Sequence, residues 1–187
     1  KPVYLTTTKV IDKRLVDFDI ASRDGHVQTL LFHARVEEKK GIFVTRDSFN
    51  LLKESYPHLR MKVVGSGSAL RPARDYVAEK RIGDVIFTGS LSGKELSDQF
   101  IGSDIYIFPT AHGEGMPTSL LEAMAFGLPV ITRPIGGTAD FFENGIMGYI
   151  TESFSPAEYA AAISRYIEDG ELTRKTSSYN HNYALNN

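Results

Sequence analysis

Short apolar runs alternate with amphipathic stretches along most of this chain, and this alternation limits the fold more than any other feature of the sequence. Residues 105–108, for example, read Ile-Tyr-Ile-Phe, a run typical of a strand that is buried on both faces. Such strands separated by helices indicate βαβ units with right-handed crossovers. We therefore expect an α/β fold, a doubly wound parallel sheet with helices on both faces.

Turn and cap residues place the boundaries of the expected elements. Pro57 ends the first long helix. Ser92 with Glu95, and Ser155 with Glu158, have the spacing of capping boxes at helix starts. The expected strands are residues 30–34, 61–64, 84–88, 105–108, 129–132 and 149–150. The expected helices are residues 42–56, 69–80, 92–101, 117–126 and 157–168.

The length of 187 residues suits one domain with appended segments. Residues 1–28 are polar and only partly periodic, so we expect an arm or linker there. Residues 29–172 carry the alternating strand and helix pattern. Residues 173–187 have the pattern of a helix that stops before its natural end.

Composition excludes several classes of function. The sequence contains no cysteine, which rules out disulfides, thiolate nucleophiles and cysteine-bound zinc. The formal net charge is −2 and no long basic run is present, so we expect no nucleic-acid partner. No apolar run approaches the roughly 18 residues that a membrane span needs. A cytoplasmic location fits these features.

Cations, glycines and carboxylates follow the expected strands at the point where each strand ends. Arg35 and Lys40 come after the first strand, Gly65 and Gly67 after the second, and residues 110–122 after the fourth. In an open parallel sheet, ligands bind beyond the carboxyl ends of the strands. The sequence therefore predicts a site there for an anion that carries many hydroxyl groups.

Two carboxylates flank the start of the helix expected at 117–126. Glu114 precedes it, and Glu122 lies four residues past Thr118, one turn further along the same face. Free N–H groups at a helix start can bind phosphate, and Pro117 has none to offer. The donors would be the backbone N–H groups of Gly115, Met116, Thr118 and Ser119. The alternative is a glutamate that caps the helix and a second, solvated one.

Arg35 and Lys40 could neutralise a diphosphate, because arginine offers a planar fork for phosphate oxygens and lysine a mobile charge. The alternative is a charged loop, since residues 37–40 read Glu-Glu-Lys-Lys. The glycine loop at 65–67 has Leu70 where a dinucleotide fingerprint has its third glycine. We expect a tight turn that lets backbone approach a ligand, and a poor site for NAD.

Other candidates carry less weight. Asp17-Phe18-Asp19 mimics a metal-binding D-x-D sequence but lies in the arm before the first strand. The five histidines show no metal-ligand spacing, so we expect no metal site. His33 lies inside a strand, where we expect a core residue with its hydrogen bonds satisfied. His112 precedes Glu114 and could contact a sugar.

Residues 114–125 read EGMPTSLLEAMA, and residues 127–131 read GLPVI. This block is similar to the E-x7-E signature of glycosyltransferase family 4, the group 1 glycosyltransferases. Residues 34–41 resemble the G-R-x-x-x-x-K-G stretch of that family, residues 65–67 its G-x-G loop and residues 85–89 its strand before the nucleobase pocket. The chain thus resembles the Rossmann-like C-terminal half of a GT-B enzyme, which binds the donor.

The resemblance implies roles for the charged candidates. Glu114 would bind hexose hydroxyls and support the transition state, and Glu122 would bind ribose hydroxyls. Arg35 and Lys40 would clamp the diphosphate and stabilise the charge that develops on it. Most members of the family retain the anomeric configuration and need no metal. The donor would be a nucleoside-diphosphate sugar of the UDP or GDP type, with no further cofactor.

The resemblance also implies contacts made by the main chain. The glycine loop would lie close to the ligand, the residues around the start of the helix at 117–126 would hold phosphate and sugar, and backbone near Val85 and Ile86 would meet the base. The residues assigned to such contacts are Gly65, Gly67, Val85, Ile86, Gly115, Met116, Thr118 and Ser119.

Departures from the family pattern matter to the expected activity. Ala34 replaces the usual glycine before the arginine, and Asp140 stands where a glutamate is usual. The N-terminal acceptor domain is missing, so residues 1–28 would be the interdomain linker and residues 173–187 the start of a helix that crosses back. We expect this chain alone to bind donor weakly and to transfer poorly or not at all.

Other functions stay open at this point. The acceptor would be a glycan or a lipid-linked sugar bound by the missing domain, with peripheral association of the full enzyme at the inner face of the membrane. The commonest use of the family suggests synthesis of bacterial surface polysaccharide. One alternative is a fragment of a GT-B-like nucleotide-sugar 2-epimerase, against which the E-x7-E block argues. The other is a non-catalytic nucleotide-binding module, which natural chain length would distinguish from the transferase.

Overall fold

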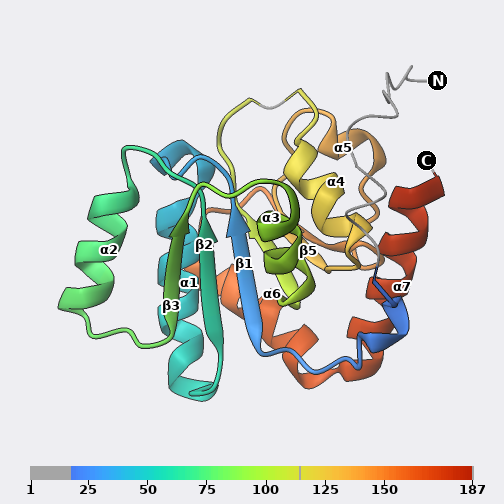
Figure 1. The fold of residues 1–187 in the computed structure, drawn as a ribbon, viewed down its shortest axis with the longest axis horizontal. Coiled ribbons are helices and arrows are strands. Elements are labelled where there is room, and N and C mark those ends of the chain that lie inside the picture. The colour runs from blue at the N-terminus through green and yellow to red at the C-terminus, as the bar shows by residue number, and fades with distance from the viewer. Residues whose placement is uncertain (1–17, 114, 187) are drawn as a thin grey trace.

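The computed structural model describes residues 18–113 and 115–186, which form a parallel sheet between two layers of helices (Figure 1). All strand pairs are parallel, in the order β3-β2-β1-β4-β5-β6. The order runs outward from β1 on one side and from β4 on the other, as the expected doubly wound topology requires. The strands are β1 (Thr29–His33), β2 (Arg60–Val64), β3 (Val85–Gly89), β4 (Ile105–Phe108), β5 (Val130–Thr132) and β6 (Gly148–Ile150).

The helices cover both faces of this sheet. The α1 helix packs against α2 and α6, which lie on one face with it, while α4 packs against α7 on the other. Right-handed crossovers place them so, because the chain changes direction across the sheet between β3 and β4. The helices are α1 (Ile42–Ser55), α2 (Leu70–Glu79), α3 (Gly93–Ile101), α4 (Thr118–Ala125), α5 (Thr138–Phe141), α6 (Pro156–Glu168) and α7 (Gly170–Asn186).

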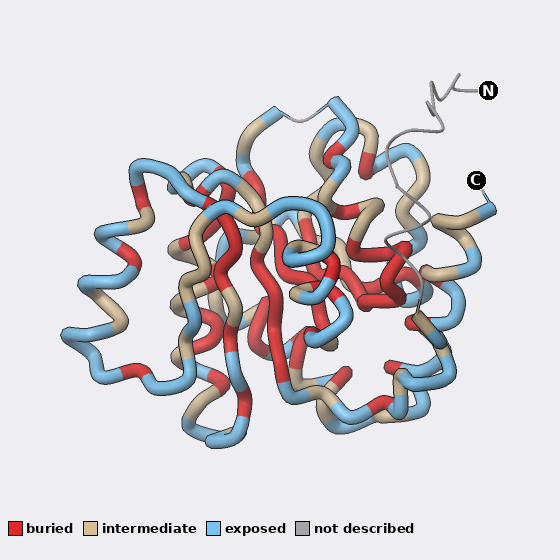
Figure 2. The backbone as a smooth tube through the Cα atoms, viewed as in Figure 1, coloured by how far each residue is buried: buried red, intermediate tan, exposed pale blue. Residues whose placement is uncertain are grey.

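The core lies in the central strands, where burial is concentrated in Figure 2. Leu30, Leu31 and Phe32 of β1 are fully buried, as are Ile105 and Ile107 of β4. Continuous rather than alternating burial follows from helices on both faces of the sheet. No helix in the described part of the chain is both long enough and apolar enough to cross a membrane.

The sequence placed the elements well and two of their caps wrongly. Ser92 and Ser155 are the N-cap residues of α3 and α6, but neither side chain makes the expected capping hydrogen bond. Glu158 instead accepts a hydrogen bond from the hydroxyl of Tyr149, 2.9 Å away, and another from Thr151. These hydroxyls come from β6 and the loop after it, so a tertiary contact replaces the local one. The last helix begins at Gly170, three residues before its expected start.

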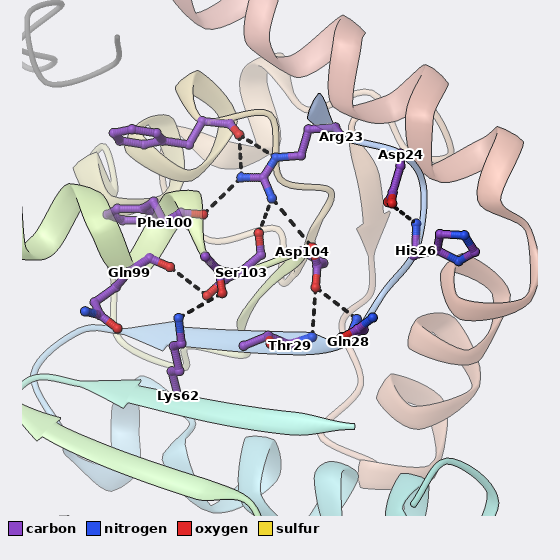
Figure 3. A network of polar contacts seen from close by, with 12 residues as sticks. Arg23, Asp24, His26, Gln28, Thr29, Lys62, Gln99, Phe100, Ser103 and Asp104 are labelled. Carbon is purple, nitrogen blue, oxygen red and sulfur yellow. Dashed lines mark hydrogen bonds and ion pairs between the residues drawn. The ribbon is translucent and has the colours of Figure 1, made fainter. Parts of the chain in front are cut away.

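A buried arginine joins residues 18–28 to the amino edge of the sheet (Figure 3). The guanidinium of Arg23 donates to the carbonyl oxygens of Phe126 at 2.9 Å, Phe100 at 3.0 Å and Ser103. These carbonyls end α3 and α4, which therefore receive a positive charge where the helix dipole favours one. The side chain of Arg23 is only 10% exposed.

Asp104 completes this network just before β4. Its Oδ1 lies 3.6 Å from Arg23 NH1, and its Oδ2 accepts hydrogen bonds from the backbone N–H groups of Gln28 at 2.9 Å and Thr29 at 2.8 Å. Burial raises the pKa of Asp104, while these hydrogen bonds and Arg23 act in the opposite direction. The pair thus fixes the start of β1 against the start of β4.

We expect the substitution Arg23→Met to lower the free energy of unfolding by about 3–5 kcal/mol, because it leaves the Asp104 carboxylate without its cation and three carbonyls without their donor. Urea denaturation followed by circular dichroism measures this change. The matched control is Arg71→Met, since the Arg71 side chain is 91% exposed. Equal stability of the two variants would contradict the role of Arg23.

Candidate functional site

The loops after β1, β2 and β3 are bonded to one another at the carboxyl edge of the sheet. The N–H of Val36 donates to the carbonyl of Ser66 at 2.9 Å, and the N–H of Gly65 donates to the carbonyl of Gly89 at 2.8 Å. The hydroxyls of Ser66 and Ser90 lie 2.8 Å apart. The predicted glycine loop is therefore held between its two neighbours.

Glycine is required at position 65 because of this close approach. Gly65 has a φ of +134°, and a Cβ atom there would lie 2.0 Å from the carbonyl oxygen of Ala34. A Cβ atom at Gly67 would lie 2.4 Å from the carbonyl oxygen of Val36. The two glycines thus let the loop after β2 lie directly on the loop after β1, which carries the predicted cations.

Arg35 and Lys40 lie between β1 and α1, but in different surroundings. The Arg35 side chain is 62% exposed, with its NH1 3.1 Å from Oε1 of Glu37. Lys40 is buried in a short 3-10 helix, Glu38–Lys40, that leads into α1. Glu37 therefore competes with any anion for Arg35, while Lys40 is held by the fold. Within the described residues, no three His, Asp or Glu side chains are grouped so as to hold a metal ion.

The start of α4 carries the predicted main-chain contacts. Thr118 begins the helix and Pro117 is its N-cap residue rather than its first residue. Gly115 and Met116 are exposed just before it. The carbonyl of Gly115 accepts a hydrogen bond from the N–H of Gly137 at 2.6 Å, which ties this loop to the one after β5. Glu114 lies outside the described residues.

Glu122 of α4 lies opposite the end of β1. Its Oε2 is 3.9 Å from Nδ1 of His33, and both side chains are partly buried. Burial raises the pKa of Glu122 to about 7 and lowers the pKa of His33 to about 4. Near neutral pH, the imidazole is therefore uncharged and the carboxyl group is close to its titration midpoint. A solvated surface glutamate, the alternative interpretation from sequence, is wrong.

The expectation that His33 is a satisfied core residue is also wrong. Its Nδ1 is buried, and the described residues provide no hydrogen-bond partner for it. The signal in the sequence was its position, because His33 is the last residue of β1 and therefore lies at the carboxyl edge.

Tyr106 connects β1, β4 and α4 beneath these groups. Its hydroxyl donates to the carbonyl of His33 at 2.8 Å and lies 2.8 Å from Oγ of Ser119. Since the tyrosine hydroxyl has one proton, Ser119 donates in the second bond. The Ser119 hydroxyl is thus already engaged, which leaves its backbone N–H as the group for the predicted contact.

The structure does not bring Val85 and Ile86 to the other site residues. Val85 begins β3 opposite Met61, and Ile86, which follows it, is 49% exposed. The carboxyl end of β3 is Gly89, beside Gly65. The rule that ligands bind beyond the carboxyl ends of strands would have selected Gly89 and Ser90 in place of Val85 and Ile86.

Arg133, at the end of β5, serves the structure of this edge. Its guanidinium donates to the carbonyls of Glu152 at 2.8 Å and Thr110 at 3.3 Å, and it lies 3.7 Å from the ring centre of Phe154. Phe154 also lines a cavity of about 700 Å³. The other lining residues lie mainly between β1 and α1 and after β4: Glu37, Glu38, Lys39, Gly41, Phe43, Val44, Ser68, Pro109 and Ala111.

The sequence matches known glycosyltransferases. It is 29% identical over 162 residues to the amylovoran biosynthesis glycosyltransferase AmsK of Erwinia amylovora, which covers 82% of this chain and 40% of AmsK. It is 28% identical over 139 residues to the putative colanic acid biosynthesis glycosyltransferase WcaL of Salmonella typhimurium, covering 71% of this chain and 34% of WcaL. This chain thus matches between a third and two fifths of the length of these relatives.

Solved structures share the fold. The C-terminal domain of a group 1 family glycosyl transferase (LpcC) from Francisella tularensis superposes with a TM-score of 0.81 and 19% identity, covering 94% of this chain and 96% of that domain. The pneumococcal O-GlcNAc transferase GtfA, in complex with UDP and GlcNAc, gives a TM-score of 0.75 at 23% identity, covering 84% of this chain and 32% of GtfA. These likenesses confirm the predicted fold class, the Rossmann-like C-terminal half of a GT-B fold.

The family model described as glycosyl transferases group 1 matches residues 16–183, nearly the whole chain. The predicted resemblance is thereby confirmed, and the chain belongs to the group 1 glycosyl transferase family.

Proposed function

We propose that this chain is the donor-binding domain of a retaining hexosyltransferase that uses a nucleoside-diphosphate sugar to build a surface polysaccharide. The observation that carries the proposal is the Glu122 carboxyl group, held partly buried at the carboxyl edge of the sheet, one turn inside α4. A carboxylate in that position can accept hydrogen bonds from paired hydroxyls, as ribose offers. The names of AmsK and WcaL, which place them in polysaccharide biosynthesis, support the role.

The diphosphate would bind between the loop after β1 and the start of α4. The helix start offers backbone N–H groups and the positive end of its dipole, and Arg35 and Lys40 add two cations. Arg35 would exchange its contact with Glu37 for phosphate oxygens. Structures of Anabaena HepE and GtfA with the same fold contain UDP, which supports a uridine nucleotide as the first ligand to test.

These groups also suit the reaction. As the bond between the anomeric carbon and the phosphate oxygen breaks, negative charge grows on the departing diphosphate. Cations and N–H groups fixed in advance stabilise that charge without reorganising, which lowers the barrier. Glu114 would bind hexose hydroxyls and support this transition state.

AmsK and WcaL are longer than the part that this chain matches. The acceptor would bind to a domain that corresponds to the remaining part. A glycan or a lipid-linked sugar is the acceptor that fits the proposal. We therefore expect this chain to bind the donor and to transfer poorly by itself.

Calorimetric titration with UDP, GDP, ADP and NAD tests the proposed donor site. We expect one nucleoside diphosphate to bind, and Arg35→Ala to weaken it about 5- to 100-fold, the effect of losing a charged hydrogen bond. Arg71→Ala, which removes an exposed arginine on α2, is the control. Binding of NAD alone, or equal binding by Arg35→Ala and the control, would contradict the proposal.

Glu122→Gln should stabilise the unliganded protein and weaken its binding of ligand. Burial raises the pKa of Glu122 from 4.5 to about 7, so the folded state disfavours the carboxylate. The cost is absent below pH 4.5, grows as the pH rises, and is complete above pH 7, where it amounts to about 3 kcal/mol.

Urea denaturation of both proteins at several pH values measures this difference. The variant should be the more stable at pH 8, and the two curves should meet near pH 4.5. A constant difference across that range would show that the Glu122 carboxyl group is not the source.

A further inference from the structure

The His33 side chain is a partly buried polar group that the proposed binding scheme does not yet use. Its ring lies edge-on to Phe100, with the ring centres 5.5 Å apart and the planes at 85°. Its Nδ1 is inaccessible to water and has no hydrogen-bond partner among the described residues. Buried nitrogens are nearly always hydrogen-bonded, so an unpaired one at the edge of a binding site needs a reason.

Glu122 is the group that Nδ1 faces. The separation of 3.9 Å from Oε2 is too long for a hydrogen bond, which needs about 2.7–3.2 Å. A side-chain movement of roughly one ångström would close it. The backbone would not have to move, because the Tyr106 hydroxyl already bonds the carbonyl of His33 and lies 2.8 Å from the Ser119 hydroxyl on α4.

We propose that His33 is the positioning residue of Glu122: its Nδ1–H donates to Oε2 of the ionised carboxylate and leaves Oε1 free to accept from ligand hydroxyls. The role of Glu122 toward ribose rests on the proposed function, whereas the contact with His33 does not. A carboxylate held through one oxygen keeps its plane fixed, so the other oxygen presents its lone pairs in a defined direction.

The neighbouring groups are consistent with this assignment. Other groups near the pair are the Tyr106 hydroxyl from β4, which bonds the carbonyl of His33, the Ser119 hydroxyl from α4, which bonds that hydroxyl, and the Phe100 ring from α3. None of these three carries a charge near neutral pH. Burial accounts for the shifts of both pKa values, and it keeps His33 neutral throughout the range in which Glu122 titrates. A neutral imidazole with its proton on Nδ1 is therefore the donor.

Ligand binding then depends on the proton of Glu122. A ligand that donates hydrogen bonds to the carboxylate selects its ionised form, so affinity rises as the pH rises through about 7 and levels off above it. Loss of the His33 donor would disfavour the ionised form and move this rise to higher pH.

The variants His33→Asn and His33→Leu test the proposal. The asparagine side-chain nitrogen occupies nearly the place of Nδ1, whereas leucine has a similar shape and no donor. Carbon-13 NMR of the Glu122 carboxyl group, without ligand, should give the same pKa in the wild type and His33→Asn. In His33→Leu the pKa should be about one unit higher. The exposed His58, changed to asparagine, is the control.

Binding of UDP-glucose between pH 5.5 and 8.5 provides the second measurement, since its phosphates do not titrate in that range. His33→Leu should weaken binding about fivefold at pH 7 and shift the rise in affinity upward, and His33→Asn should restore the wild-type profile. In a Glu122→Gln background, His33→Leu should have no further effect, because the two residues act as one unit.

The outcomes separate the two proposals. If Glu122 titrates alike in the wild type and His33→Leu, the positioning role is wrong whatever UDP-glucose does. If the carboxyl pKa shifts as expected but no nucleotide or nucleotide sugar binds, the proposed function is wrong and the positioning of Glu122 stands. Nitrogen-15 NMR of wild-type His33 needs no variant: a proton on Nδ1 supports the proposal, and a proton on Nε2 overturns it.

Discussion

The pairing of β1 with β4 is the contact on which both the fold and the site depend. The strand order reverses at this pair, yet its register extends over only Leu30↔Ile105 and Leu31↔Tyr106, whereas β1 and β2 share five register pairs. Side-chain hydrogen bonds supplement this short backbone pairing of β1 with β4. Asp104 bonds the start of β1 at one edge, and the Tyr106 hydroxyl bonds its end at the other. The loops that diverge beyond that end are therefore anchored close to the point of divergence, which is where doubly wound sheets bind ligands.

Much of the fold could be predicted because its signals are local. An apolar run such as 105–108 predicts a strand by itself, and Pro57 ends a helix whatever lies nearby. The capping box expected at Ser155 does not form because its glutamate has other partners. Glu158 has the correct spacing from Ser155, but hydroxyls at Tyr149 and Thr151 take its carboxylate. The spacing of two residues in the sequence indicates which hydrogen bond they could form, but it does not indicate whether another partner lies nearer in the folded structure.

The sequence predicted the site only for residues that follow the end of a strand. Arg35, Gly65 and Glu122 follow strands, and the structure places all three in the connections at the carboxyl edge. Val85 and Ile86 match the family pattern, but they lie at the amino end of their strand, away from the edge where ligands bind. Whether His33 faces Glu122 depends on how α4 is rotated relative to β1. The spacing of residues within the helix or within the strand does not determine this rotation.

His33 and Glu122 also show that a site can be recognised by the energetic cost of burying its polar side chains. Burial disfavours the charged form of each side chain, as the opposite shifts of their pKa values indicate, and Nδ1 of His33 has no hydrogen-bond partner among the described residues. Apolar residues of similar volume at both positions would avoid this penalty. Among the described residues, three buried side-chain atoms lack a hydrogen-bond partner, and one of them, Nδ1 of His33, lies at the carboxyl edge beside Glu122. The unpaired nitrogen is accounted for if the Glu122 carboxylate accepts its hydrogen bond, because the second carboxylate oxygen then remains for a ligand.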